Sequence, residues 1–453
     1  MRILFSILLI INGLWSISAQ SLKQYEKAGN TAFDKKDYNA AIQHFAKVLE
    51  KDPKNWDVLY KYAECARLFY AYPIAEKSFN KIADSKRKKD FPLIDFRLGE
   101  VKKSEGEYQA ARAFFKKYLD EGPAPDEAFV KRAKSEIETC DWALKRLAEA
   151  DKTEVKPLGR EVNSNYSDFA PALRGDTLWF SSYRFELDKS HKKPKPRTTK
   201  ILQAIGSAKA KQPGRGFPAD DSTHVAHTVF SEKYARMYCT FCKNIGPQDI
   251  RCEIYLLEKE KKGKWSKPKR LAPSVNLKGS TATQPNLFFD KKTRREQLLF
   301  ASDRPGGKGK LDIYQVPLDS ASGQPIGEPQ PLTAVNTPEN DGTPFFSTSD
   351  GTLWFASEGW QGMGGWDIYS SKMDASGNFS APQHAAPPIN TSYNDLYFIL
   401  KNDGKSGFLA SNRPGSMFLD ASNKACCNDI FSVKFPPPPP PGKPPAPPTA
   451  GVP

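Results

Sequence analysis

The stretch Leu353-Trp354-Phe355-Ala356-Ser357 is an aromatic-rich segment that ends in small and polar residues, and four similar segments occur elsewhere in the chain. They are Leu178-Trp179-Phe180-Ser181-Ser182, Met237-Tyr238-Cys239-Thr240, Leu299-Phe300-Ala301-Ser302 and Gly407-Phe408-Leu409-Ala410-Ser411. Around these copies, from about residue 153 to 435, apolar and polar residues alternate and turn residues are frequent, which is typical of strands. The five copies therefore predict an all-β region built from five similar units.

Two further elements accompany this segment. Four copies are followed by an acidic residue and a β-rich strand, at Glu253-Ile254-Tyr255, Asp312-Ile313-Tyr314, Asp367-Ile368-Tyr369 and Asp429-Ile430-Phe431. The first copy has Lys200-Ile201-Leu202 in that place. An apolar residue and an asparagine end the units at Val275-Asn276, Val335-Asn336 and Ile389-Asn390, and one more such pair, Val162-Asn163, precedes the first unit.

The last unit is short. Residues 391–435 provide only 45 positions, whereas successive asparagines are 60 and 54 residues apart in the two units before it. The 11 residues from Thr153 to Asn163 would bring the last unit to 56. We therefore expect the first strand of the region to complete the last blade of a five-bladed β-propeller over residues 153–435, which would leave no open sheet edge.

Before residue 150 the pattern is helical and repeats with spacings of 34 and then 36 residues. The repeated positions are Gly29, Ala63 and Gly99, then Ala41, Ala75 and Ala111, then Phe45, Phe79 and Phe115. Small residues let paired helices approach closely, and the aromatic ring fills the remaining gap. This pattern resembles the tetratricopeptide repeat and implies an α-solenoid over residues 20–150. Residues 126–149 add an amphipathic helix suited to capping the stack, with Val130, Ile137, Cys140, Leu144 and Leu147 on one face.

Such a stack presents a concave groove lined by the first helix of each repeat, a surface that binds peptides or partner domains. In this register the predicted groove carries Glu26, Asn30, Tyr60, Glu64, Phe96 and Glu100. The alternative is that these are ordinary solvated helix positions.

The two ends of the chain have their own character. Arg2, the apolar run Ile3 to Ile17, and Ser18-Ala19 predict a secretory signal over residues 1–19 that is cleaved before Gln20. No later apolar stretch reaches the length of a membrane-spanning helix, so the mature chain is expected to have no transmembrane segment. Residues 436–453, with six consecutive prolines from Pro436 to Pro441, predict an extended, disordered tail.

The charge is basic but diffuse. Lys and Arg number 67 against 52 Asp and Glu, a formal net charge of +15, which favours acidic partners without indicating a nucleic-acid site. A basic insertion contains Lys189, Lys192, Lys193, Lys195, Arg197 and Lys200, either as a solvated loop or as a surface for an acidic protein or lipid headgroup. No nucleophile elbow, metal-binding histidine pair or phosphate loop occurs, so we expect no enzyme activity and no cofactor.

Export would place the seven cysteines in an oxidising compartment. Cys65 and Cys140 lie in helical patterns and are expected to be buried. Cys239, Cys242 and Cys252 lack a fourth zinc ligand, so a local disulfide is preferred to a metal site. Cys242 and Cys252 flank a short connection between strands, and Cys426 and Cys427 lie in an equivalent connection later in the chain.

Four residues are candidates for a binding face on the propeller. Arg184, Arg304 and Arg413 each follow the second strand of a blade, and Trp360 lies in the glycine-rich run from Gly359 to Gly365. The alternative for the arginines is a bond to an acidic or carbonyl group of the next blade. The alternative for Trp360 and its neighbour Trp366 is turn packing.

Ser302-Asp303-Arg304-Pro305-Gly306-Gly307 and Asp312-Ile313-Tyr314 resemble the WD40-like PD40 repeats that also occur in TolB-like proteins. The whole arrangement is similar to periplasmic Bacteroidota proteins in which tetratricopeptide repeats and a PD40 propeller precede a Pro-rich linker and an OmpA-like peptidoglycan-binding domain. One such protein belongs to the type IX secretion and gliding apparatus. This chain stops at the Pro-rich linker, and no cysteine lies near the predicted cleavage point, so neither direct cell-wall anchoring nor a lipid anchor is expected.

The resemblance implies a periplasmic, non-catalytic scaffold in an outer-membrane-associated complex. Its partners would be outer-membrane or periplasmic proteins, including those of a peptidoglycan-associated complex. The alternative is a propeller that binds a glycan or a cell-wall fragment.

Overall fold

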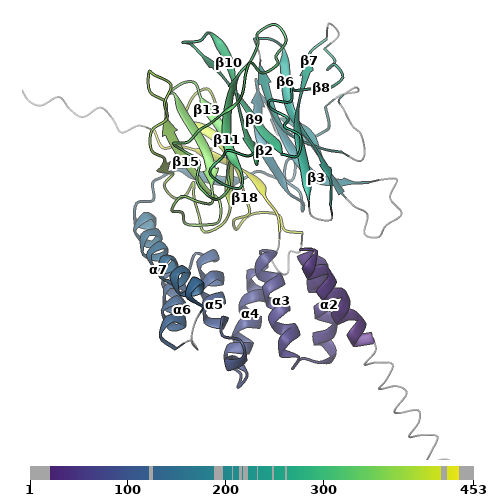
Figure 1. Cartoon of the computed structure of the whole chain (residues 1–453), viewed down its shortest axis with the longest axis vertical. Coiled ribbons are helices and arrows are strands. Elements are labelled where there is room, and N and C mark those ends of the chain that lie inside the picture. The colour runs from purple at the N-terminus through teal and green to yellow at the C-terminus, as the bar shows by residue number, and fades with distance from the viewer. Residues whose placement is uncertain are drawn as a thin grey trace, which may run out of the picture.

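The computed structural model describes residues 21–121, 126–187, 197–206, 208–213, 217, 223–231, 233–246, 249–260, 263–419 and 426–437. The predicted signal segment, the tail from residue 438 onward and Lys189 to Lys195 of the basic insertion lie outside this part. Helical repeats are followed by a five-bladed β-propeller, and Figure 1 shows the helices gathered on one side of the propeller. None of the helices in the described part is both long and apolar enough to cross a membrane.

The helical region begins with a helix over residues 21–34. It continues with α2 (Tyr38–Lys51), α3 (Trp56–Leu68), α4 (Tyr72–Ala83), the short 3-10 helix η1 (Lys88–Asp90), α5 (Ile94–Ser104), α6 (Tyr108–Glu121) and α7 (Glu127–Ala148). Polar caps start several of them: the Asp37 side chain accepts from the Ala40 N–H at the start of α2, and Asn55 accepts from the Val58 N–H at the start of α3. These helices therefore begin where the sequence supplies a polar N-cap, whereas α4 and α5 begin after Ala71 and Leu93 without a side-chain cap.

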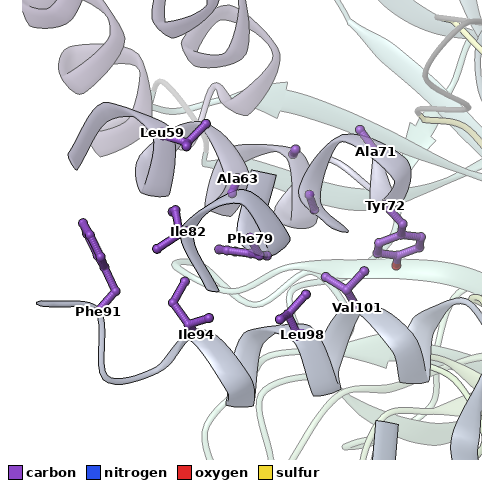
Figure 2. Close-up of a cluster of buried hydrophobic side chains, with 12 residues drawn as sticks. Leu59, Ala63, Ala71, Tyr72, Phe79, Ile82, Phe91, Ile94, Leu98 and Val101 are labelled. Atoms are coloured by element: carbon purple, nitrogen blue, oxygen red, sulfur yellow. The ribbon is translucent and has the colours of Figure 1, made fainter. Parts of the chain in front are cut away.

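Small residues bring the paired helices together as the repeat pattern predicts. A Cβ at Gly29 would lie 2.5 Å from the Phe45 ring, and one at Gly99 would lie 2.7 Å from the Phe115 ring, so only glycine fits at these two positions. Apolar side chains from successive helices then form continuous clusters. Figure 2 shows one, in which Phe79 and Ile82 of α4 point toward Ile94 and Leu98 of α5.

Five antiparallel sheets form the propeller. Blade 1 contains β2 (Asp168–Arg174), β3 (Thr177–Glu186) and β4 (Arg197–Ile205); blade 2 contains β5 (His224–Ser231), β6 (Arg236–Asn244), β7 (Ile250–Glu258) and β8 (Lys269–Arg270). Blade 3 contains β9 (Ala282–Asp290), β10 (Arg295–Ser302), β11 (Asp312–Pro317) and β12 (Gln330–Pro331); blade 4 contains β13 (Asp341–Ser347), β14 (Thr352–Ser357), β15 (Asp367–Lys372) and β16 (Gln383–His384). Blade 5 contains β17 (Asp395–Leu400), β18 (Ser406–Ser411) and β19 (Asp429–Lys434).

The first strand of the region closes the ring, as predicted. The outer strand of blade 5 is β1 (Glu154–Pro157), which pairs antiparallel with β19 from Glu154 opposite Lys434 to Pro157 opposite Phe431. Residues almost 280 positions apart therefore share one sheet, and the outer edge of β19 is covered.

The repeated asparagines hold the connectors between blades. Asn276 accepts from the Ile254 N–H (2.8 Å) and donates to the Ile254 and Leu271 carbonyls (2.8 and 3.2 Å). Asn336 makes the same pair of bonds to Ile313, and Asn390 to Ile368. Asn163 makes them to Ile430, which fastens the start of the region to its last strand. In each case a buried amide pairs with the third strand of a blade as another strand would.

Asn276→Ala is predicted to lower the free energy of unfolding by about 2–5 kcal/mol, because it leaves the Ile254 N–H and the Leu271 carbonyl buried without these partners and removes one of the two donors to the Ile254 carbonyl. The matched control is Asn378→Ala, since Asn378 is exposed in a turn and its loss is expected to change stability by less than about 0.5 kcal/mol. Thermal and urea unfolding of both variants test this. Equal midpoints for the two variants would contradict the role given to the asparagines.

Candidate interaction surfaces

The first helices of the repeats carry a ladder of polar contacts along one face. The Lys61 ammonium of α3 donates to the side-chain amide oxygen of Asn30 (Oδ1) at 2.8 Å. The next steps are Arg97 to Glu64 (3.2 Å), Arg67 to Glu100 (3.6 Å), Arg132 to Glu100 (2.5 Å) and Lys103 to Glu136 (2.6 Å). We call this face, formed by residues 21–34, α3, α5 and α7, the repeat groove.

The ladder contains unequal numbers of positive and negative side chains. Five cations (Lys61, Arg67, Arg97, Lys103 and Arg132) share it with three carboxylates (Glu64, Glu100 and Glu136). Burial alone would raise the pKa of Glu100, but the charges of Arg67, Arg97 and Arg132 outweigh it and hold that pKa below its ordinary value. The ladder therefore contains more cations than carboxylates, and Glu100 stays ionised.

Most of the predicted groove residues lie on this face. Glu26, Asn30 and Tyr60 are partly exposed, and Tyr60 stacks on Phe91 with ring centroids 5.2 Å apart. Glu64 and Glu100 are mostly buried but belong to the ladder. Whether a partner binds there stays a prediction.

The assignment of Phe96 to the groove surface is wrong. Its side chain is fully buried among the helices, edge-to-face with Phe115 and Phe129 at centroid distances of 5.3 and 5.1 Å. The added helix α7 explains this, because Phe129 of α7 covers the position that would otherwise be open. Phe96 therefore stabilises the repeats and is unavailable to a partner.

A methionine of the propeller is inserted into the helical region. Met363, in the connection between β14 and β15, is almost fully buried in the apolar cluster of α5, α6 and α7, with Phe96, Tyr108 and Cys140 among its members. The Tyr108 hydroxyl donates to the Met363 carbonyl at 3.1 Å. Burying a Met side chain contributes roughly 1.5–3 kcal/mol, so this contact anchors one domain to the other.

Three neighbouring contacts extend this junction. The Ser392 hydroxyl donates to the Ser104 carbonyl at 3.0 Å, and Tyr393 packs against Tyr72 at the start of α4. On α7, the Trp142 ring meets His384 edge-to-face at 4.9 Å. All these propeller residues belong to blade 4 or to the connection into blade 5, so the propeller holds the helices by one edge, and in the described part of the chain these contacts involve none of the ladder residues.

Sequence reasoning missed Met363. It singled out Trp360 and Trp366 in the same glycine-rich run, yet the methionine between Gly362 and Gly364 makes the contact. A lone apolar residue among glycines in a hydrophilic turn was the available signal. Trp360 remains partly exposed and donates its indole N–H to the Val335 carbonyl at 2.8 Å.

The three candidate arginines are occupied within the propeller. Arg304 donates to the carbonyls of Ser274 (2.7 Å) and Val275 (2.5 Å), and Arg413 to those of Pro388 (2.7 Å) and Ile389 (2.6 Å). Arg184 donates to the Val162 carbonyl and to Asp168. The prediction of a ligand face at Arg304 and Arg413 is therefore wrong, because both side chains are buried and fix the connector that precedes their own blade.

The buried carboxylates between blades differ in whether an arginine pairs with them. Arg413 pairs with Asp395, and Arg184 with Asp168. Asp429 has no cation partner among the described residues, and its Oδ1 atom is buried without a hydrogen bond there. Burial, together with the charge of Asp168, raises the pKa of Asp429 to about 8.

The cysteines divide into two groups. Cys242 and Cys252 lie opposite each other on β6 and β7 and form a disulfide, and adjacent Cys426 and Cys427 form a second one before β19. Cys65, Cys140 and Cys239 are buried thiols, and burial raises the pKa of Cys65 and of Cys140 to about 12. At ordinary pH these two thiols are therefore protonated and unreactive.

The two histidines of blade 2 contact different blades. His224 is buried beside Thr199, whose N–H donates to its Nδ1 atom at 3.2 Å, while His227 meets Tyr397 of blade 5. Within the described ranges, no group of three or more His, Cys, Asp or Glu side chains is arranged to hold a metal ion.

Comparison with known proteins supports the helical assignment. Residues 32–88 match a family model described as tetratricopeptide repeat. No curated protein matches the chain. The chain thus combines tetratricopeptide repeats with a five-bladed β-propeller.

The solved structures that resemble the chain include glycoside hydrolases, whose sequence identity to it is low. The xylan beta-1,4-xylosidase of Bacillus halodurans C-125 is 13% identical with a TM-score of 0.41, over 62% of this chain and 56% of that one, so the chain spans little more than half of it. The alpha-L-arabinofuranosidase of Lactobacillus brevis is 10% identical with a TM-score of 0.40, over 60% and 91%. The GH43 endo-arabinanase of Bacillus licheniformis is 12% identical with a TM-score of 0.39, over 61% and 96%. At these scores the likeness carries no argument about function.

Met363→Ala is predicted to weaken the junction by about 2–4 kcal/mol, because it removes the buried side chain that the helices surround. Trypsin cleavage after the exposed Lys152, in the segment joining the domains, is then expected to accelerate. Met373→Ala, a matched change within the propeller, should leave this rate near that of the unaltered chain. Equal cleavage rates for both variants would contradict the anchoring role.

Asp429→Asn is predicted to stabilise the protein at high pH. The folded carboxyl keeps its proton up to about pH 8, whereas the unfolded one loses it near pH 4, so the unaltered protein loses stability as pH rises between these values. The asparagine does not titrate and can still accept from the Met417 N–H. The melting temperature of Asp429→Asn should therefore rise further above that of the unaltered protein as the pH increases from 5 to 9. A difference that does not change with pH would contradict the raised pKa assigned to Asp429.

Proposed function

We propose that the protein is a non-catalytic scaffold that binds a protein partner in the repeat groove. The observation that carries this proposal is the line of charged side chains along the first helices of the repeats, together with junction contacts, including those of Met363 and Tyr393, that lie at one edge of the propeller. None of the described junction contacts involves a residue of the ladder, and tetratricopeptide repeats support protein binding.

The partner is an acidic segment of another protein. The ladder supplies more cations than carboxylates, and the chain as a whole has a formal net charge of +15. Arginine and lysine side chains in a groove attract carboxylates over several ångströms and then form charge-assisted hydrogen bonds with them. Such recognition weakens as salt is added.

The place of action is the periplasm, in a complex associated with the outer membrane. This part of the proposal depends on the signal-like residues 1–19 and on the resemblance to Bacteroidota proteins with the same two domains. Candidate complexes are the type IX secretion and gliding apparatus and peptidoglycan-associated assemblies.

Lys61→Glu in the full chain is predicted to reduce partner capture at least tenfold, because it reverses a groove charge at a partly exposed position. Lys47→Glu is the matched control: it makes the same charge change at an exposed position of α2, outside the groove. Tagged chains are expressed in their native cells, cross-linked and purified from envelopes, and co-purifying proteins are quantified by mass spectrometry.

The proposal predicts an outer-membrane or periplasmic protein that is captured by the unaltered chain and by Lys47→Glu and is reduced at least tenfold with Lys61→Glu. Equal capture by both variants would exclude the repeat groove. The absence of any stoichiometric protein partner would reject the scaffold function.

A further inference from the structure

A cavity of about 1170 Å³ lies at the centre of the propeller, where the first strands of all five blades converge. One residue of each first strand adopts a left-handed backbone conformation there: Ala170, His227, Gln284, Thr343 and Tyr397, with φ between 52° and 55°. In every blade the register between the first and second strands shifts at this residue. A left-handed backbone conformation is energetically costly for residues other than glycine. Its repetition at five equivalent positions indicates that the fold holds these five residues in place as a ring around the centre.

Four members of the ring, all except Ala170, are polar, and hydrogen bonds link them. The Tyr397 hydroxyl lies 3.0 Å from His227 Nε2 and accepts from the Gln284 amide at 3.4 Å. The Gln284 carbonyl in turn accepts from the Thr343 N–H at 2.8 Å, and His227 Nδ1 lies 3.3 Å from the Thr283 hydroxyl. Burial lowers the pKa of His227 to about 3, so the imidazole is neutral. The floor of the cavity is therefore an uncharged network of donors and acceptors.

Aromatic and amide side chains lie next to this polar network. The rings of His227 and Tyr397 are nearly parallel with centroids 5.6 Å apart, and Phe169 lies 5.6 Å from one and 5.7 Å from the other. Phe345 and Asn286 line the wall, and both are partly exposed. The Asn286 carbonyl accepts from the Phe346 N–H at 3.0 Å, which leaves its NH2 group to donate to a ligand.

The cavity opens away from the helices. Its lining reaches the turns after β2, β13 and β17, at Asp176, Ser349 and Asp403. The contacts with the helices are made at the opposite ends of these strands, beside Asp367 and Asp395. A ligand in the cavity would therefore meet neither the junction nor the repeat groove.

We propose that this cavity binds a neutral oligosaccharide. Sugar hydroxyls both donate and accept hydrogen bonds, as the amides, phenol and neutral imidazole of the cavity do, and the apolar face of a sugar ring packs on aromatic walls such as Phe345. The volume exceeds that of an ordinary small-molecule pocket, which suits several sugar units. This site adds a ligand to the proposed scaffold and does not depend on it.

The same residues favour binding over hydrolysis. Glycoside cleavage uses a pair of carboxyl groups on either side of the scissile bond. None of the five central positions is a carboxylate, and the acidic groups of the lining, Glu161, Asp176 and Asp403, come from a connector and turns. The oligosaccharide is expected to be released intact.

The test is a glycan array of neutral and acidic oligosaccharides probed with the full chain, followed by titration calorimetry with cellotetraose, xylotetraose and tetra-N-acetylchitotetraose. Gln284→Ala and Tyr397→Phe are expected to weaken binding at least tenfold. Tyr255→Phe is the control, because it removes a hydroxyl that bonds only Glu253 on the outside of blade 2. Circular dichroism and melting temperatures establish that each variant is folded.

Binding of a neutral glycan that the two cavity variants weaken and the control does not would support the proposal. It would be overturned by an array on which only acidic glycans or no glycans bind, or by neutral binding that both cavity variants leave unchanged. Lys61→Glu should bind the glycan normally, so a failed scaffold function and a failed glycan site would be told apart.

Discussion

The structure depends most on the buried asparagines that end the connectors leading into blades 1, 3, 4 and 5. By pairing with both backbone groups of an isoleucine in a third strand, Asn163, Asn276, Asn336 and Asn390 fix where each connector turns. The carbonyls just before the asparagine are then in place for Arg184, Arg304, Trp360 and Arg413 of the following blade. The same constraint at Asn163 ties the start of the ring to its end, and at Asn390 it positions Ser392 and Tyr393 against the helices.

Much of this could be predicted from the sequence because repetition exposes it. The spacing of glycine, alanine and phenylalanine identified the helical repeats, and the count of pairs of an apolar residue and an asparagine, together with the short last unit, predicted closure by β1. The left-handed central ring was harder to foresee, since its five members, Ala170, His227, Gln284, Thr343 and Tyr397, share no chemistry. Their equivalence lies in the register of the backbone, which composition does not reveal.

The wrong assignments have one physical cause. Phe96 and Arg304 were placed on surfaces because a repeat pattern locates a residue on a face but does not show what covers that face. Phe129 of α7 covers Phe96, and a connector from the preceding blade takes the N–H groups of Arg304. Met363 was missed for the opposite reason: its importance comes from a second domain, and a lone apolar residue in the glycine-rich turn does not identify the surface that it contacts.

The central claim is that the propeller fixes the orientation of the helical repeats, so that the repeat groove and the cavity mouth are held at set positions. The most direct test is the distance distribution between spin labels at Lys47 on α2 and at Ser376 in the turn after β15, both exposed. The account predicts one narrow distribution in the full chain that broadens in Met363→Ala. A broad distribution in the unaltered chain would contradict it.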